Sequence, residues 1–155
     1  MGKSLNLTCQ ILNSDEEILN NKEIIIINSF GTLQSFYKYS KSVFIGKSTI
    51  KQLENVGGQN PLEAAKLGCK IYHGPFVYNF KDIYSLLSQK NVSKQVNNYR
   101  ELVENLILDF NSPKESNHDF ISLINHLEQK ILYDSIEKIN LFINENKQTK
   151  ILGSK

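Results

Sequence analysis

The sequence predicts an α/β domain built on a doubly wound parallel sheet and followed by a long C-terminal helix. Short β-branched and apolar runs alternate with segments of helical spacing, which is the rhythm of β-α-β units. One run, 24–27, consists of four isoleucines, and strands that are apolar on both faces are typical of parallel sheets. Near the C-terminus, apolar residues recur at helical spacing over 119–146. These features favour a Rossmann-like domain.

The first part of the chain contains three predicted strands. The expected elements are a strand at 4–12, a helical turn at 15–20, a strand at 24–27, a helix at 32–39 and a strand at 42–45. The strand at 4–12 alternates loosely, and the helix at 32–39 places its apolar residues at helical spacing. This order already gives one β-α-β unit.

The next part continues the same rhythm after a polar connection at 46–58. We expect a helix at 61–67 ended by Gly68, a strand at 69–72, a helix at 80–88, an edge strand at 92–96 and a helix at 99–110. Asn111-Ser112-Pro113 stops the last of these helices. We therefore expect a Rossmann-like region at 1–112 and a helical extension at 113–155.

The C-terminal helix carries an apolar stripe that the small sheet is too short to cover. Phe120, Ile124, Leu127 and Ile131 recur at intervals of three or four residues. We expect either a contiguous exposed apolar patch along these four residues or self-association of the chain.

Composition excludes several classes of protein. At 155 residues the chain can hold one domain and an appendage. Its longest apolar run, 24–27, is far shorter than the roughly 20 residues that span a bilayer, and the N-terminus lacks the apolar region of a signal peptide. With only two cysteines, a reducing cytoplasm is the expected compartment.

Charge and metal-ligand spacing restrict the function further. A net charge of +2 with a single arginine does not indicate nucleic-acid binding. The stretch 38–81, however, holds seven lysines against two glutamates, which either attracts an anionic ligand or forms a solvated face. The three histidines and two cysteines have no metal-ligand spacing, so no metal and no cofactor are expected. His73, at a strand end, is expected to bond a neighbouring loop.

The segment 57–63 is a loop that opens onto a helix N-terminus. Gly57 and Gly58 allow close approach of backbone to a ligand, Asn60 suits an N-cap, Pro61 the first helical position and Glu63 the third. Free N–H groups at such a place bind anions. The same pattern also fits a capping box, in which the glutamate folds back onto the N-cap N–H. Both interpretations stay open at this point.

Two neighbouring strand ends carry similar loops. Phe44-Ile45-Gly46-Lys47-Ser48 ends one strand, and the other is followed by Gly74-Pro75 and then Asn79-Phe80. Because ligands of parallel α/β sheets bind outside the carboxyl ends of the strands, these loops form one candidate site.

In order and spacing, these motifs resemble the signature of the Kdo transferases, which transfer 3-deoxy-D-manno-octulosonic acid (Kdo) from CMP-Kdo to a lipid A precursor. The signature is similar to 44–48, 57–65, 74–75 and 79–80, and the resemblance covers about 5–110. It implies the C-terminal, donor-binding half of a GT-B glycosyltransferase, in which the Rossmann-like domain at 1–112 would be incomplete at its start. It also implies that the acceptor half, with its membrane anchor and glutamate base, is missing, so no catalytic residue is expected here and the chain is taken as a fragment.

The resemblance also implies donor-binding residues. They are Gly31, Thr32, Leu33, Lys47, Ser48, Gly57, Gly58, Gln59, Asn60, Glu63, Gly74 and Pro75. Glu63 would accept hydrogen bonds from the ribose, and Asn60 would order the loop. The segment 57–59 would offer N–H groups to the phosphate or the Kdo carboxylate, helped by the Ser48 hydroxyl and the Lys47 charge, and 31–33 would line the cytosine side.

Three residues depart from the family pattern. Asn28 replaces a common aspartate, Thr32 a glutamate and Lys47 a glycine.

The resemblance therefore implies an inverting enzyme of lipopolysaccharide biosynthesis, at the cytoplasmic face of the inner membrane. Its lipid acceptor and its membrane attachment would both act through the missing half. Two alternatives remain open: a GT-B domain for another nucleotide sugar, and a non-catalytic nucleotide-binding or interaction module whose long helix docks a partner.

Overall fold

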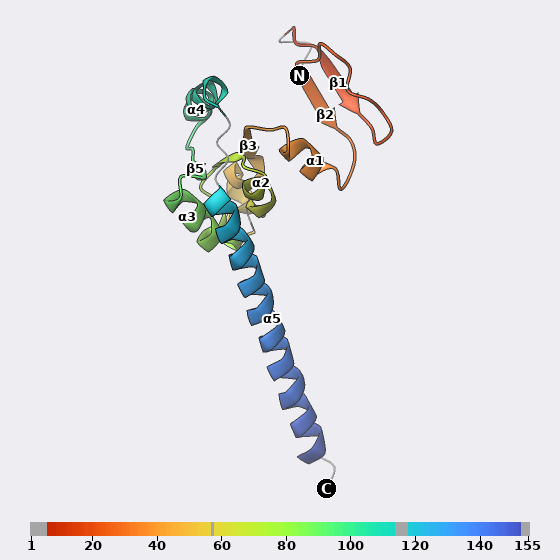
Figure 1. Cartoon of the computed structure of the whole chain (residues 1–155), viewed down its shortest axis with the longest axis vertical. Helices are drawn as coiled ribbons and strands as arrows, with labels where there is room; N and C mark the ends of the chain where they lie inside the picture. Colours follow the sequence, from red (N-terminus) through yellow and green to blue (C-terminus); the bar gives the residue numbers. More distant parts are fainter. Residues whose placement is uncertain (1–5, 57, 114–117, 153–155) are drawn as a thin grey trace. The chain divides into compact units, whose positions relative to one another are not determined.

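A computed structural model describes residues 6–56, 58–113 and 118–152 of the chain. The chain divides into two compact units, Met1–Tyr39 and Ser40–Lys155 (Figure 1). Each unit has a parallel sheet of its own, with two strands in the first and three in the second. The predicted α/β class with parallel strands is therefore confirmed, and its strands are distributed over two sheets.

The first unit contains two strands and one short helix. β1 (Cys9–Leu12) pairs in parallel with β2 (Ile24–Ile27), and α1 (Leu33–Tyr37) follows. The predicted helical turn at 15–20 is wrong: the segment is an irregular loop. There the Gln10 side chain donates to the Glu17 carbonyl at 2.8 Å and accepts from the Leu19 N–H at 2.9 Å. The glutamine thus satisfies backbone groups that a helical turn would have paired.

The second unit contains the larger sheet and most of the helices. The strands β3 (Ser42–Ile45), β4 (Lys70–His73) and β5 (Ser93–Gln95) are parallel in the order β3-β4-β5. The helices α2 (Leu62–Lys66) and α3 (Lys81–Gln89) connect them, and α4 (Tyr99–Asn111) follows. The register places Ile45 beside His73 and His73 beside Gln95. The three carboxyl ends therefore lie at one edge.

Local chemistry explains where these elements begin and end. The Asn98 side chain accepts from the N–H groups of Arg100 and Glu101, both at 3.0 Å, and so caps α4. Gly68, with a φ of 75°, follows α2 as predicted. The polar connection at 46–58 contains two short 3-10 turns, η2 (Gly46–Thr49) and η3 (Lys51–Leu53), and a third, η4 (Tyr78–Phe80), precedes α3.

The core of the second unit forms between the sheet and its helices. Its buried apolar residues include Ile45, Leu62, Ala64, Ala65, Cys69, Ile71, Tyr72, Tyr84, Leu87, Val96 and Ile124. Both connecting helices and all three strands or their flanks contribute, so the loops at the strand ends stand on a packed base.

The C-terminal helix is confirmed and is longer than predicted. α5 (His118–Leu152) is a single helix that packs mainly against α2 (Figure 1). Ile124 is fully buried, and Lys66 forms an ion pair with Glu128. The predicted exposed patch is therefore wrong at Ile124, because α2 covers that turn, while Ile131 is 50% exposed. The side chains of Phe120 and Leu127 lie outside the described part.

Beyond the turn that packs against α2, the apolar residues of α5 face solvent. The exposed set is Ile131, Leu132, Tyr133, Ile136, Ile139, Leu141, Phe142 and Ile143. Within the described part of the chain, no helix is both long and apolar enough to cross a membrane.

Candidate functional site

Three loops of the second unit meet at the carboxyl ends of β3 and β4. They are η2, the segment 58–61 before α2, and the segment 74–80 before α3. The Phe76 N–H donates to the Ser48 carbonyl at 2.9 Å, and the Tyr84 hydroxyl donates to the Gln59 carbonyl at 3.1 Å. The structure therefore brings together the motifs that the sequence separates by up to thirty residues.

Ser48 joins the ends of β3 and β4. Its side chain is fully buried, and its hydroxyl donates to the Ile45 carbonyl and accepts from the Gly74 N–H at 2.7 Å. Gly74 has no room for a side chain, since a Cβ there would lie 2.5 Å from the Ser48 carbonyl oxygen. Both residues thus fix the architecture of the site, and a direct contact of either with a donor stays a prediction.

Gly58 is required by its backbone conformation and by its neighbour. Its φ is 90°, and a Cβ would lie 3.1 Å from the Cα of Val77. The close approach that the glycine allows is therefore made by the loop before α3. Gly57, the other predicted glycine, lies outside the described residues.

The start of α2 shows half of the predicted capping box. The Asn60 Oδ1 accepts from the Leu62 N–H at 3.0 Å, so Asn60 orders the loop as expected. Pro61 occupies the N-cap position, one residue earlier in the helix than predicted. The Glu63 carboxylate is exposed, and none of the described residues hydrogen-bonds or ion-pairs with it. The capping interpretation therefore accounts for Asn60 and leaves Glu63 unexplained.

The remaining predicted residues of this unit lie at the surface. Lys47, Gln59 and Pro75 are exposed around the same loops. The Lys47 ammonium, on η2, has no ion-pair partner among the described residues. An exposed lysine of this kind favours anions.

Gly31, Thr32 and Leu33 belong to the first unit. Gly31 has a φ of 79° and open space around its Cα, and Leu33 is 54% exposed. The Thr32 hydroxyl pairs with that of Ser29 at 2.9 Å. The Asn28 amide, which replaces the common aspartate, donates to the Asn13 side chain at 3.0 Å. Contact of these residues with a donor stays a prediction.

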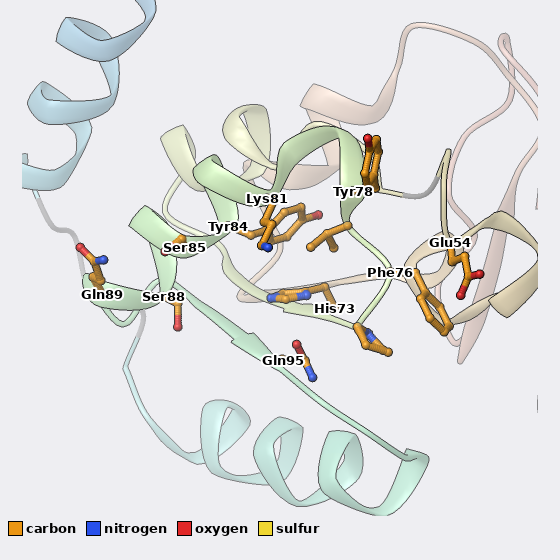
Figure 2. A pocket seen from close by; sticks show the side chains of 12 residues that line it. Glu54, His73, Phe76, Tyr78, Lys81, Tyr84, Ser85, Ser88, Gln89 and Gln95 are labelled. Atoms are coloured by element: carbon orange, nitrogen blue, oxygen red, sulfur yellow. The ribbon is translucent and has the colours of Figure 1, made fainter.

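A cavity of about 520 Å³ opens beside the loops 58–61 and 74–80, called the donor loops below (Figure 2). Its lining residues are Glu54, His73, Pro75, Phe76, Val77, Tyr78, Lys81, Tyr84, Ser85, Ser88, Gln89 and Gln95. Among the predicted site residues that the structure describes, only Pro75 lines it. Sequence reasoning missed Lys81 and Gln95, although the strand register, which sets Gln95 beside His73, offers a signal for the latter.

His73 is one of the residues that line this cavity. As expected for a strand-end histidine, it bonds a neighbouring loop, with its Nδ1 2.7 Å from the Gly74 carbonyl oxygen. Its ring is tilted against that of Tyr84, with 4.3 Å between the centroids. Burial lowers the pKa of the imidazole, so the ring is neutral at physiological pH.

A second cavity, of about 500 Å³, lies near Asp109 of α4. The Asp109 carboxylate accepts from the hydroxyls of Ser42 at 2.5 Å and Tyr72 at 2.8 Å. Burial and the carboxylate raise the pKa of Tyr72, so its hydroxyl stays protonated. These bonds tie α4 to the sheet. Among residues 6–56, 58–113 and 118–152, no three side chains of the metal-ligating kinds lie together.

Comparison of the sequence with known proteins finds relatives of this chain. No model of a protein family matches the sequence. The 3-deoxy-D-manno-octulosonic acid transferase of Rickettsia prowazekii is 30% identical over 135 residues, which cover 84% of this chain and 28% of that protein. The enzyme of the same name from Aquifex aeolicus is 29% identical over 84 residues, which cover 54% and 23%. These matches confirm the resemblance to the Kdo transferases.

A solved structure confirms the fold. The C-terminal CMP-Kdo binding domain of WaaA from Acinetobacter baumannii superposes with a TM-score of 0.64 at 21% identity, over 83% of this chain and 64% of that domain. The chain spans about a quarter of the length of the curated relatives it matches. It matches a part of such a protein and shares the fold of that solved domain.

Proposed function

We propose that this chain, a sequence relative of the Kdo transferases, is the donor-binding part of an enzyme that transfers Kdo from CMP-Kdo to a lipid A precursor. The observation that carries the proposal is the exposed Glu63 carboxylate at the start of α2, which has no partner among the described residues. A carboxylate accepts two hydrogen bonds in parallel, which suits the vicinal hydroxyls of a ribose.

The surrounding groups fit the rest of a nucleotide. Gly58 and Gln59 would present N–H groups to the phosphate, and Lys47 on η2 would add a positive charge. Ser48 and Gly74 would hold the loops in place through their hydrogen bond. In this arrangement the chain orients the donor and stabilises the charge that develops on the CMP leaving group.

We assign the other functions of the enzyme to the part of the relatives that this chain does not match. There we place the glutamate base that deprotonates the acceptor hydroxyl, the site for the lipid acceptor and the attachment to the cytoplasmic face of the inner membrane. The reaction is inverting in this proposal, because a base-activated hydroxyl displaces CMP directly.

Nucleotide binding by the purified chain tests the proposal. We expect saturable binding of CMP in calorimetry, weaker binding of UMP and AMP, and no turnover with CMP-Kdo and a lipid A precursor. Stronger binding of UMP would favour the alternative of a GT-B domain for another nucleotide sugar. Absence of binding to all three nucleotides would overturn the proposal, and turnover by the chain alone would overturn the placement of the base.

A further inference from the structure

We infer that the cavity bounded by His73, Lys81 and Gln95 is the subsite for the sugar-acid part of the donor. The inference rests on the proposed function and adds to it a place and a chemical class: a hydroxylated ring that bears one carboxylate. None of these three residues belongs to the motifs that carry the family resemblance.

The cavity shares its wall with the donor loops. Tyr84, which lines it, donates a hydrogen bond to the Gln59 carbonyl, and Val77, which also lines it, packs against Gly58. The 58–60 loop and the cavity are therefore neighbours within the second unit, on either side of these two side chains, and a donor bound at the loop would reach the cavity over them. The volume of about 520 Å³ is within the range of roughly 300–1,000 Å³ for small-molecule sites.

His73 offers a hydrogen-bond acceptor inside the cavity. Because its Nδ1 bonds a carbonyl oxygen, that nitrogen carries the proton, and Nε2 has a free lone pair. None of the described residues hydrogen-bonds to Nε2. In the described part of the chain, every buried side-chain nitrogen or oxygen has a hydrogen-bond partner. An unbonded Nε2 is therefore accessible, and it faces the cavity that His73 lines. The residue as a whole is only 5% exposed. A buried acceptor of this kind is suited to a sugar hydroxyl.

Lys81 supplies the charge that a carboxylate requires. It lies at the first residue of α3, and its ammonium has no hydrogen-bond or ion-pair partner among the described residues. Figure 2 shows this side chain directed toward the His73 ring, whereas the Glu54 carboxylate lies beyond Phe76. The positive and negative groups of the lining are thus separated, which leaves the His73 end of the cavity suited to an anion.

Gln95 completes the polar lining from the edge strand. Its amide nitrogen donates to the Asn97 side chain at 3.2 Å, which leaves its carbonyl oxygen to accept from a second hydroxyl. Phe76 and Tyr84 provide apolar faces on which the ring carbons can lie. One cation, two acceptors and aromatic walls fit a hydroxylated acid better than a neutral hexose or a flat base.

The test compares two lysine variants in the full chain. Lys81→Met removes the charge at the cavity, and Lys90→Met removes the same charge at the other end of α3, outside the lining. Both lysines are exposed, so both variants should fold. Affinities for CMP, for free Kdo and for CMP-Kdo are measured by ligand-observed NMR.

We expect Lys81→Met to weaken CMP-Kdo and free Kdo by about tenfold, the lower end for hydrogen bonds to charged groups, and to leave CMP unchanged. Lys90→Met should change none of the three. Equal affinities of the two variants for CMP-Kdo, with CMP binding intact, would overturn the subsite and leave the proposed function standing. If the unaltered chain fails to bind CMP, the proposed function fails as well.

Discussion

Glu63→Gln separates the two interpretations of the loop before α2. The substitution keeps the length and the hydrogen-bonding shape of the side chain and removes its charge. If Glu63 served a capping box, glutamine would replace it with little loss, and any loss would appear in stability. If Glu63 binds a ribose, the loss appears in affinity.

The structure sets the size of each effect. Because the carboxylate is exposed and no described residue bonds it, stability should change by no more than about 0.5 kcal/mol. A hydrogen bond to a charged group is worth about 1.5–3 kcal/mol. Loss of that bond to a ribose hydroxyl corresponds to a fall in CMP affinity of about ten- to a hundredfold.

The assay pairs calorimetric titration with CMP and urea unfolding of the same samples. Asp82→Asn is the matched control, since Asp82 is the acidic residue in the first turn of α3 and its loss has the same effect on charge. We expect the control to leave CMP affinity unchanged. Unchanged CMP affinity in Glu63→Gln would refute the ribose assignment, whatever the effect of the substitution on the free energy of unfolding.

Two further predictions concern the groups that support the site. Ser48→Ala should lower the free energy of unfolding by about 1–3 kcal/mol, because it leaves the Gly74 N–H without its partner. Thr49→Ala, at an exposed position of the same turn, should lower it by less than about 0.5 kcal/mol. Urea unfolding measures both variants, and equal losses would contradict the role of Ser48. Burial lowers the pKa of His73 in the folded chain, so below pH 6.5 the unfolded chain binds the proton more readily than the folded chain does. The free energy of unfolding should therefore fall as the pH drops below 6.5. In His73→Gln, the dependence of the free energy of unfolding on pH should be weaker in this range.

Much of the second unit could be predicted because its signals are local. Periodic apolar runs located β3, β4 and α3 to within one residue, and Gly68 marked the end of α2. The loop 15–20 could not be predicted in this way, because its conformation depends on the Gln10 side chain from a preceding strand. Such a contact leaves no periodic trace in the segment that it shapes.

The motifs define the candidate site, but they do not separate residues that would bind a donor from residues that support the loops. Ser48 and Glu63 stand in the same signature, yet one is fully buried between backbone groups and the other is exposed. That difference depends on how η2 folds against Gly74, which sequence spacing does not encode. The sequence does not predict Lys81 as a site residue, because a lysine at the start of a helix is typical of an ordinary solvated surface.

The contact between α5 and α2 has a mechanical consequence. α5 is held by Ile124 and by the ion pair of Glu128 with Lys66, the last residue of α2. α2 has five residues, and Glu63 is its second. Because a helix this short behaves as a rigid rod, a force on α5 that reaches Lys66 would also act on the first turn of α2. Beyond Glu128, α5 extends for 24 residues, about 36 Å, and its ion pair with Lys66 lies one helical turn from the carboxylate that we assign to the ribose.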